Sequence, residues 1–330
     1  MGSKFCLFRG WSGLVLGLLA VPGPAGQTDD PPAAWVGDYP IPVSGVEWQF
    51  ADQFGNAGDI DPQIAARLRA EILRQRIDQQ LILMQLAETG FRVTADQVDL
   101  QVARIAERAA EYDQTLDEFL SGKKLTRPVL RFNLKWQASW QKYLDSTLTD
   151  EVLERYFRRH QRQFDGTRVR VAHLLLPLTV TVTPEETEQA RQLAEAIATR
   201  IRNGELEWTQ ATGQYSAAPT AGDGGDLGWI EYARPMSREF SEAAFTLDPE
   251  EISPPVQTRA GIHLIRCLEV RPGSTNWYDV RRPLRAAAVR ELFRLLADRK
   301  RSDVEIRFTG VTPWIDPESG ELQLAVPERR

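Results

Sequence analysis

The sequence predicts an α+β protein in which a small mixed or antiparallel sheet domain, with surrounding helices, is inserted in a mostly helical domain. Two apolar runs typical of strands, 169–176 and 261–267, mark the two ends of the predicted sheet domain. Amphipathic segments with helix-start signals precede it over 61–165. One more amphipathic segment and an alternating run follow over 275–310. Because one helix and one strand cannot bury a core alone, we expect them to rejoin the helical domain.

Length and composition bound the class of protein. A chain of 330 residues is long enough for two domains. Its hydrophobic content of 42%, with nine Trp and thirteen Phe, is sufficient for well-packed cores and excludes a disordered chain. The formal net charge of −6 argues against nucleic-acid binding, which requires a basic excess. We therefore expect no nucleic-acid partner.

Residues 1–26 have the pattern of an export signal. Lys4 and Arg9 supply positive charge, a short apolar run follows, and small residues near Ala25 suit cleavage. The apolar run is far shorter than the ~20 residues that span a bilayer. We expect an exported protein of the periplasm or cell envelope; an uncleaved signal would keep it attached to the membrane. A buried helix is the alternative. After cleavage Cys267 would be the single cysteine, which suits an oxidising compartment.

Residues 27–60 are rich in Pro, Gly and Asp and predict a linker, with its aromatic residues docked in part. Residues 311–330 are interpreted as a tail. Between them, Asp61 with Pro62 at the first helical position predicts a helix start. The apolar faces of the helices predict a bundle core, and the open question is whether part of that surface binds client chains. Further helices are expected from Thr94, from Thr115, over 129–144, from Thr149 and over 280–301.

The central segment, 166–271, contains two of the three histidines of the chain, His173 and His263, one on each predicted end strand. Thr183-Pro184 and Ser237 predict the starts of two helices between the strands. The glycine run 222–228 lacks the Lys-Ser/Thr ending of a phosphate-binding loop, so it predicts a turn with positive φ. No Cys or carboxylate stands at ligand spacing beside the histidines, so we expect no metal site.

Seven short motifs follow one another in this segment: His173–Leu176, Tyr215-Ser216, Gly224–Trp229, Met236 with Phe240, Ala243–Phe245, Ile252–Val256 and Thr258–His263. In this order and spacing the segment resembles a parvulin peptidyl-prolyl isomerase domain. The flanking segments resemble the extracytoplasmic foldases SurA and PrsA. Those combine a signal peptide, a helical chaperone region and a parvulin domain with a C-terminal helix that returns to the chaperone region.

The resemblance implies a site that rotates an X-Pro bond. The barrier of roughly 18–20 kcal/mol is crossed without breaking a bond, so no nucleophile, metal or cofactor is required. A dry apolar slot would hold the proline ring and favour the twisted amide. The polar residues would fix the geometry of the pocket without transferring protons. The resemblance assigns Leu227, Trp229, Met236 and Phe240 to substrate binding, and His173, Ser216, Thr258 and His263 to the catalytic group.

Two departures qualify this expectation. Ala218 stands where parvulins usually carry Asp or Cys, and the loss of a polar group would weaken catalysis. Ala260 replaces a serine that only some members carry. The stretch 179–188 is acidic, so we expect no phosphoserine-proline selectivity. The expected function is a peptidyl-prolyl cis-trans isomerase and chaperone acting on unfolded or nascent exported chains with X-Pro bonds. The alternatives are a non-catalytic holdase with a degenerate parvulin domain and an assembly factor dedicated to one partner.

Overall fold

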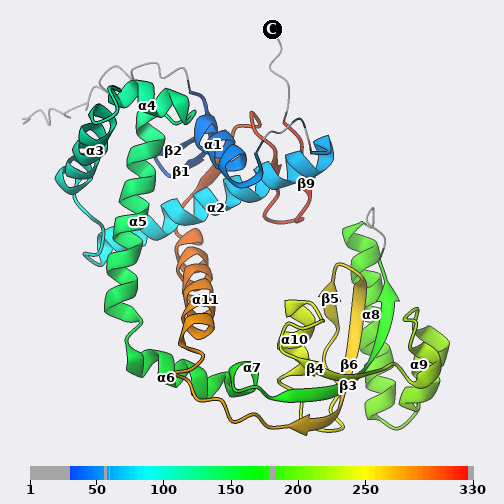
Figure 1. The fold of residues 1–330 in the computed structure, drawn as a ribbon. Helices are drawn as coiled ribbons and strands as arrows, with labels where there is room; N and C mark the ends of the chain where they lie inside the picture. Colours follow the sequence, from blue (N-terminus) through cyan, green and yellow to red (C-terminus); the bar gives the residue numbers. More distant parts are fainter. Residues whose placement is uncertain (1–29, 56–57, 59, 179–182, 326–330) are drawn as a thin grey trace, which may run out of the picture.

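The computed structural model describes residues 30–55, 58, 60–178 and 183–325 (Figure 1). The chain has two parts, a helical body built from both ends of the sequence and a sheet domain, residues 168–271. The predicted export signal lies outside the described residues. Within them, no helix combines the length and the apolar character needed to cross a bilayer.

The segment predicted as a linker is folded, so that prediction was wrong for its described part. It forms β1 (Pro32–Val36), β2 (Tyr39–Pro42) and α1 (Val43–Phe54). β1 and β2 form an antiparallel hairpin, and Ala33, Ala34 and Val36 are fully buried. The prolines that suggested a loop lie in the outer strand β2 and at the start of β1, the positions where a sheet tolerates a residue without N–H.

The helices predicted from Asp61, Thr94, Thr115 and Thr149 begin at those caps. The helix predicted over 129–144 begins two residues earlier, at Arg127, and the short helix at 161–164 was not predicted. Asp61 Oδ1 accepts from Gln63 N at 2.8 Å, and Thr94 and Thr115 each form a complete capping box. The apolar face of the first of them packs against α1, and those of the next three pack together in a second cluster. These helices are α2 (Pro62–Glu88), α3 (Ala95–Ala110), α4 (Leu116–Gly122), α5 (Arg127–Thr147), α6 (Asp150–Arg159) and α7 (Gln161–Phe164).

The C-terminal segment returns to this body. α11 (Arg281–Arg301) packs along α2 and α6, and β7 (Ile306–Phe308) pairs antiparallel with β1. The sheet order β2-β1-β7 therefore places a strand from the end of the chain beside one from its beginning. The predicted tail contains a further hairpin, β8 (Trp314–Ile315) with β9 (Leu322–Gln323), and Trp314 stacks on Phe308 with ring centroids 4.2 Å apart.

The sheet domain is a four-stranded antiparallel sheet of order β4-β3-β6-β5. α8 and α9 pack with one face of the sheet, and α10 packs with the other. α9 was not predicted because Glu207 before it makes no side-chain cap and the helix is short. The elements are β3 (Arg168–Pro177), α8 (Pro184–Arg202), α9 (Trp208–Tyr215), the 3₁₀ turn η2 (Ala221–Asp223), β4 (Asp226–Glu231), α10 (Arg238–Ala244), β5 (Val256–Thr258) and β6 (Gly261–Arg271).

The chain crosses between the two parts twice, and the crossings lie side by side. Thr275 N donates to Asp165 O at 2.9 Å, and Gly273 N donates to Thr167 Oγ1 at 3.1 Å. A Cβ at Gly273 would lie 2.0 Å from Asp165 O, so the contact requires glycine. The two crossings therefore form one hydrogen-bonded connection.

The core between α2 and α11 gives a test of this arrangement. Leu296 is 6% exposed and packs with Ile82 and Leu86, whereas its neighbour Leu295 is 50% exposed. We expect Leu296→Ala to lower the free energy of unfolding of the helical body by about 2–5 kcal/mol. Leu295→Ala is the matched control, with little change. Hydrogen exchange of α2 amides measures the effect, and equal protection in both variants would contradict it.

Candidate active site

The pairing of β3 with β6 brings two histidines together that are far apart in the sequence. In the register of these strands, His173 lies opposite Ile265 and His263 lies opposite Leu175. Both histidines therefore point to the α10 face of the sheet. Their Nδ1 atoms are 3.2 Å apart, and the side chains are buried, with 8% and 6% of the two residues exposed. One Nδ1 must donate a proton and the other accept it.

A hydroxyl extends this contact into a hydrogen-bond chain. Thr258 Oγ1 lies 2.8 Å from His263 Nε2, and the backbone N–H of Ala260 donates to the same Oγ1 at 3.1 Å. The β5–β6 turn holds Thr258 in place, and Gly261 in this turn has a φ of +141°. A Cβ there would lie 2.1 Å from Leu176 O, so glycine is needed for the close approach of β6 to β3.

Burial keeps both imidazoles neutral. Desolvation lowers the pKa of His173, and desolvation together with the neighbouring His173 lowers the pKa of His263 to about 4. Near pH 7 the site therefore offers hydrogen-bonding groups without a charge. A neutral pair suits a site that must stay dry, since a buried cation would attract water.

Three apolar side chains lie on the same face of the sheet. Phe240 of α10 is 1% exposed, and its ring meets the rings of His173 and His263 nearly at right angles, with centroids 5.9 and 5.4 Å apart. Leu227 and Met236 are partly buried and pack against the same cluster. The structure thus brings together three of the four residues predicted to bind substrate.

Trp229 is the fourth, and it lies on the other face of the sheet. Trp229 pairs with Arg170 of the neighbouring strand β3. The guanidinium of Arg271 lies 4.0 Å from the centre of the Trp229 ring. Leu227 and Trp229 are two residues apart and would share a face in a regular strand. Gly228, with a φ of +68°, interrupts the alternation, so the predicted grouping of Trp229 with the slot does not match the structure.

Ser216, predicted in the catalytic group, binds backbone. Its Oγ accepts from Leu175 N at 3.1 Å and from Ala218 N at 3.2 Å. The hydroxyl holds this turn against β3, which makes it a positioning group in the described structure. Ala218 is buried and adds no polar group, while Thr220 Oγ1, two residues further on, is buried without a hydrogen-bond partner among the described residues.

The glycine-rich turn supports His173. His173 N donates to Gly225 O at 2.9 Å, and Gly225 has a φ of +77°. A Cβ on Gly225 would lie 2.1 Å from His173 O. The turn therefore serves packing against β3. Among the described residues, no group of three or more His, Cys, Asp or Glu is arranged to hold a metal ion.

This fold and site correspond to a known domain family. The family model "Rotamase: PPIC-type PPIASE domain" matches residues 173–269. These residues form a PPIC-type peptidyl-prolyl isomerase domain of the parvulin type, set in a mostly helical chain. The matched segment begins at His173, five residues after the start of β3, and contains the paired histidines and the apolar cluster.

Beyond this domain, about three fifths of the chain resembles two kinds of foldase, as the flanking segments predicted. It is 28% identical over 216 residues to "Chaperone SurA" of Dechloromonas aromatica, covering 63% of this chain and 48% of that protein. It is 27% identical over 206 residues to "Foldase protein PrsA" of a Geobacillus species, covering 62% and 64%. The chain thus spans about half the length of the SurA relative. A crystal structure of a PpiC-type isomerase domain is 29% identical, with a TM-score of 0.30, and covers 33% of this chain and 95% of that one.

The neutral histidine pair predicts an unusual titration. With only three histidines in the chain, each imidazole signal can be assigned by one His→Asn substitution and followed by NMR. We expect His263 to keep its neutral-form shift down to about pH 5 and to titrate near 4, well below its ordinary value of 6.5. A midpoint near 6.5 would contradict the buried arrangement.

The same shift makes the stability of the sheet domain depend on pH. Between pH 6.5 and about 4 the unfolded chain binds a proton that the folded His263 does not. The contribution of the buried, neutral His263 to the free energy of unfolding is therefore complete above pH 6.5. It is lost as the pH falls toward 4. At about 1.4 kcal/mol per pKa unit it amounts to about 3 kcal/mol.

Proposed function

We propose that this protein is an exported peptidyl-prolyl cis/trans isomerase and folding chaperone for secreted or envelope proteins. The observation that carries the proposal is the neutral hydrogen-bond chain of His173, His263 and Thr258 in contact with the apolar cluster of Phe240. The match of residues 173–269 to the PPIC-type family supports the reaction class. The names of the relatives, a chaperone and a foldase, support the chaperone role.

The apolar cluster supplies the main catalytic effect. Amide resonance, a charge-separated form that water stabilises, creates the barrier to rotation of an X-Pro bond. A prolyl ring held against Leu227 and Met236 above Phe240 places the imide in a site with little water. Loss of solvation weakens the resonance, so the twisted imide is bound more strongly than the planar one.

The two histidines act as fixed polar groups. Each imidazole is held by a neighbour, His173 by His263 and His263 by Thr258 as well, so their orientation does not depend on substrate. No proton has to leave the substrate during rotation. Their contribution is a pre-arranged polar surface under the imide, which costs no reorganisation at the moment of reaction.

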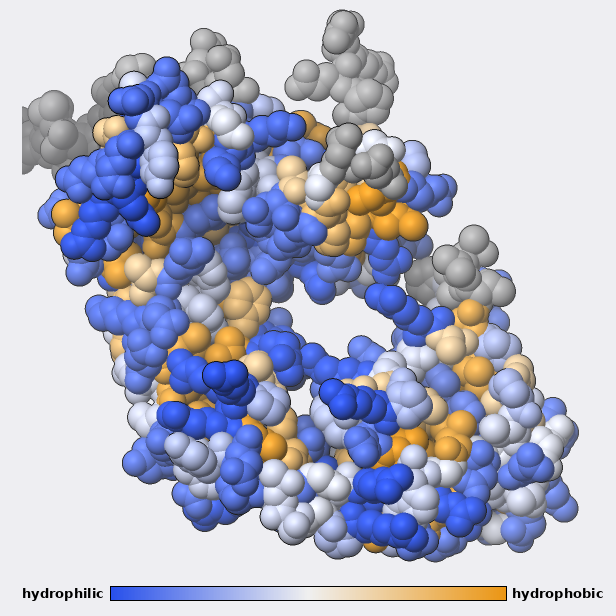
Figure 2. Space-filling model, viewed as in Figure 1, coloured by the Kyte–Doolittle hydropathy of each residue, from blue (hydrophilic) through white to orange (hydrophobic). Residues whose placement is uncertain are grey.

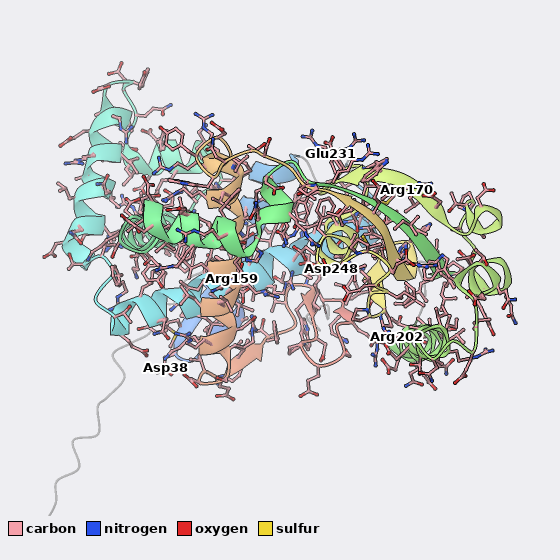
Figure 3. All side chains as sticks on the ribbon, turned by 90° about the horizontal axis from the view of Figure 1, so that it is seen from below. Asp38, Arg159, Arg170, Arg202, Glu231 and Asp248 are labelled. Carbon is pink, nitrogen blue, oxygen red and sulfur yellow. The ribbon has the colours of Figure 1, made fainter. Side chains whose placement is uncertain are left out.

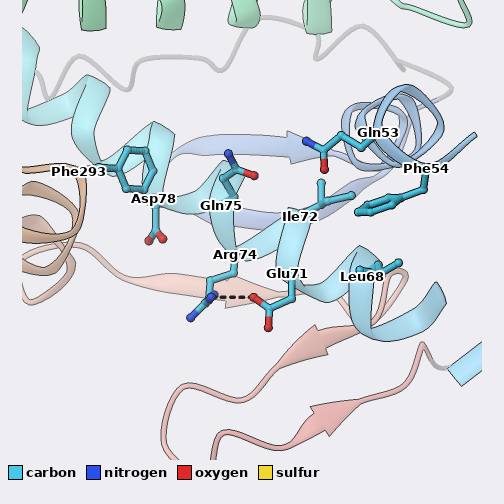
Figure 4. A pocket seen from close by; sticks show the side chains of 9 residues that line it. All are labelled: Gln53, Phe54, Leu68, Glu71, Ile72, Arg74, Gln75, Asp78 and Phe293. Atoms are coloured by element: carbon cyan, nitrogen blue, oxygen red, sulfur yellow. Dashed lines mark hydrogen bonds and ion pairs between the residues drawn. The ribbon is translucent and has the colours of Figure 1, made fainter. Parts of the chain in front are cut away.

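Unfolded chains require a second contact, and the helical body offers a partly apolar groove for it. A hollow of about 330 Å³ lies between α1, α2 and α11, and Figure 4 shows Phe54, Leu68 and Ile72 gathered on one side of it. Phe54 is 41% exposed. The apolar side of this groove suits an apolar side chain of an unfolded client. The lining is Gln53, Phe54, Leu68, Glu71, Ile72, Arg74, Gln75, Asp78 and Phe293.

Exchange spectroscopy on a proline tetrapeptide tests the isomerase. We expect the full chain to accelerate cis/trans exchange, and Met236→Ala to reduce the rate about tenfold or more, because an apolar contact of roughly 1.5–3 kcal/mol is lost. His173→Ala should reduce it as well. Trp229→Phe, on the opposite face of the sheet, is the matched control and should keep the rate. No acceleration at high protein concentration would refute the isomerase.

A non-catalytic holdase is the second candidate, and the buried Ala218 at the usually polar position favours it. Suppression of aggregation of a denatured client distinguishes the two functions. We expect Phe54→Ser to weaken suppression and Tyr112→Ser, at a residue that is 77% exposed outside the groove, to leave it intact. Suppression without any isomerase activity would establish the holdase; equal effects of both substitutions would remove the groove from the proposal.

A further inference from the structure

A large cavity lies where the helical body meets the sheet domain. Its volume is about 1470 Å³, and it is lined by α6, α7 and α11 on one side and by residues 231–248 with the end of β6 on the other. Figure 2 shows hydrophilic side chains around the opening between the two parts of the molecule. The volume exceeds the ~300–1,000 Å³ of typical small-molecule sites, so the space suits a longer ligand.

The lining of this cavity is basic although the chain is acidic. Seven arginines and five acidic residues line it, whereas the formal net charge of the chain is −6. Two of the five acids are paired with arginines of the lining: Asp248 pairs with Arg162 at 2.6 Å, and Glu242 pairs with Arg238 at 2.8 Å. Figure 3 labels Arg159 of the helical body and Asp248 of the sheet domain, which both line the cavity. Four arginines have no carboxylate partner within the described part of the chain: Arg159, Arg234, Arg290 and Arg294.

One face of α11 supplies part of the lining of the cavity and two of its arginines. Pro283 and Ala287 lie one helical turn apart on the face of α11 that lines the cavity. Arg290 and Arg294 follow at the same spacing, and both are exposed. Two positive charges at positions i and i+4 repel one another, so their arrangement favours a bound anion.

Arg290 also stands near phenols from both parts of the molecule. Burial raises the pKa of Tyr156 and of Tyr232, and the positive charge of Arg290 opposes that rise at both. Tyr156 belongs to α6 of the helical body, and Tyr232 follows β4 of the sheet domain. The unpaired charge is therefore placed at the boundary between the two parts.

A row of aromatic rings crosses the same boundary. The centroids of Tyr156 and Phe164 are 6.4 Å apart, and those of Phe164 and Tyr232 are 6.3 Å apart. Tyr232 then meets Phe245 of the sheet-domain core at 5.5 Å. These rings offer apolar contact beside the arginines, a combination that suits a polypeptide better than a small inorganic anion.

We propose that this cavity, the cleft between the two parts, binds an extended acidic segment of a polypeptide. The carboxylates of the segment would contact Arg159, Arg290 and Arg294, and its apolar groups would contact the aromatic row. The source of the segment, an unfolded client, rests on the proposed chaperone function. The arginines are supplied by α6 and α11, so the segment would lie in the corner between the helical body and the sheet domain. Nucleic acid fits less well, because the rest of the chain is acidic and would repel it.

Fluorescence anisotropy with two short, labelled peptides tests the proposal on the full chain. One peptide is rich in Asp, Glu and Tyr and contains no proline; the other replaces every Asp and Glu with Asn and Gln. We expect the acidic peptide to bind about tenfold more tightly, and its affinity to fall as salt is raised. Equal affinities for the two peptides would overturn the proposal.

Matched double variants locate the binding. We expect Arg290→Gln with Arg294→Gln to weaken binding of the acidic peptide about tenfold. Arg282→Gln with Arg299→Gln removes the same charge from exposed positions of the same helix outside the cavity, and should change it less than about twofold. Equal losses in the two double variants would refute the cleft as the site.

Two further measurements separate this proposal from others. Acceleration of proline exchange on the tetrapeptide should be unchanged in Arg290→Gln with Arg294→Gln, and acidic-peptide binding should be unchanged in His173→Ala. A protein without isomerase activity could therefore still bind the acidic peptide in the cleft. Likewise, a protein that does not bind the peptide could still be an isomerase. Sedimentation with phosphatidylglycerol vesicles that depends on Arg290, without binding of the acidic peptide, would assign the cleft to lipid and overturn the proposal.

Discussion

The antiparallel pairing of β3 with β6 is the constraint on which the rest of the structure depends. It runs from Arg168 opposite Arg271 to Pro177 opposite Gly261 and closes the sheet domain with its first and last strands. The entropy cost of such a closure grows only slowly with the length enclosed, so helices α8, α9 and α10 can be placed between the strands. The same pairing sets the two histidines side by side and, at its other end, brings the two crossings to the helical body together.

The two sites of the molecule have opposite electrostatic character. The histidine chain is buried, hydrogen-bonded and neutral, because desolvation lowers the pKa of both rings. The arginines proposed to bind ligand, Arg159, Arg290 and Arg294, are exposed. Arg76 shows how strongly burial acts on a cation in this fold: at 2% exposure, between Trp48 and Phe132, its pKa falls to about 10. A cation meant to bind ligand is better placed at a surface, as in the cleft.

Local chemistry allowed much of the fold to be predicted from the sequence. Thr94, Thr115 and Thr183 each satisfy the first backbone N–H groups of a helix, and all three helices begin at the predicted residue. The histidine pair was predicted only through family resemblance, since no local pattern links positions 173 and 263. Trp229 was misplaced because the effect of Gly228 on strand alternation cannot be judged before the turn is seen. The arginine cleft joins residues more than a hundred positions apart and leaves no local signal.

The position of β7 beside β1 fixes an order of events during synthesis. Residues 34–36 gain their second hydrogen-bonded neighbour strand only after residue 308 has been synthesised. The sheet domain is complete at residue 271, so it can fold before the last strand of the helical body, β7, has been synthesised. During that interval the apolar surface of α2 that α11 later covers remains open. For that interval the nascent chain is itself at risk of aggregation.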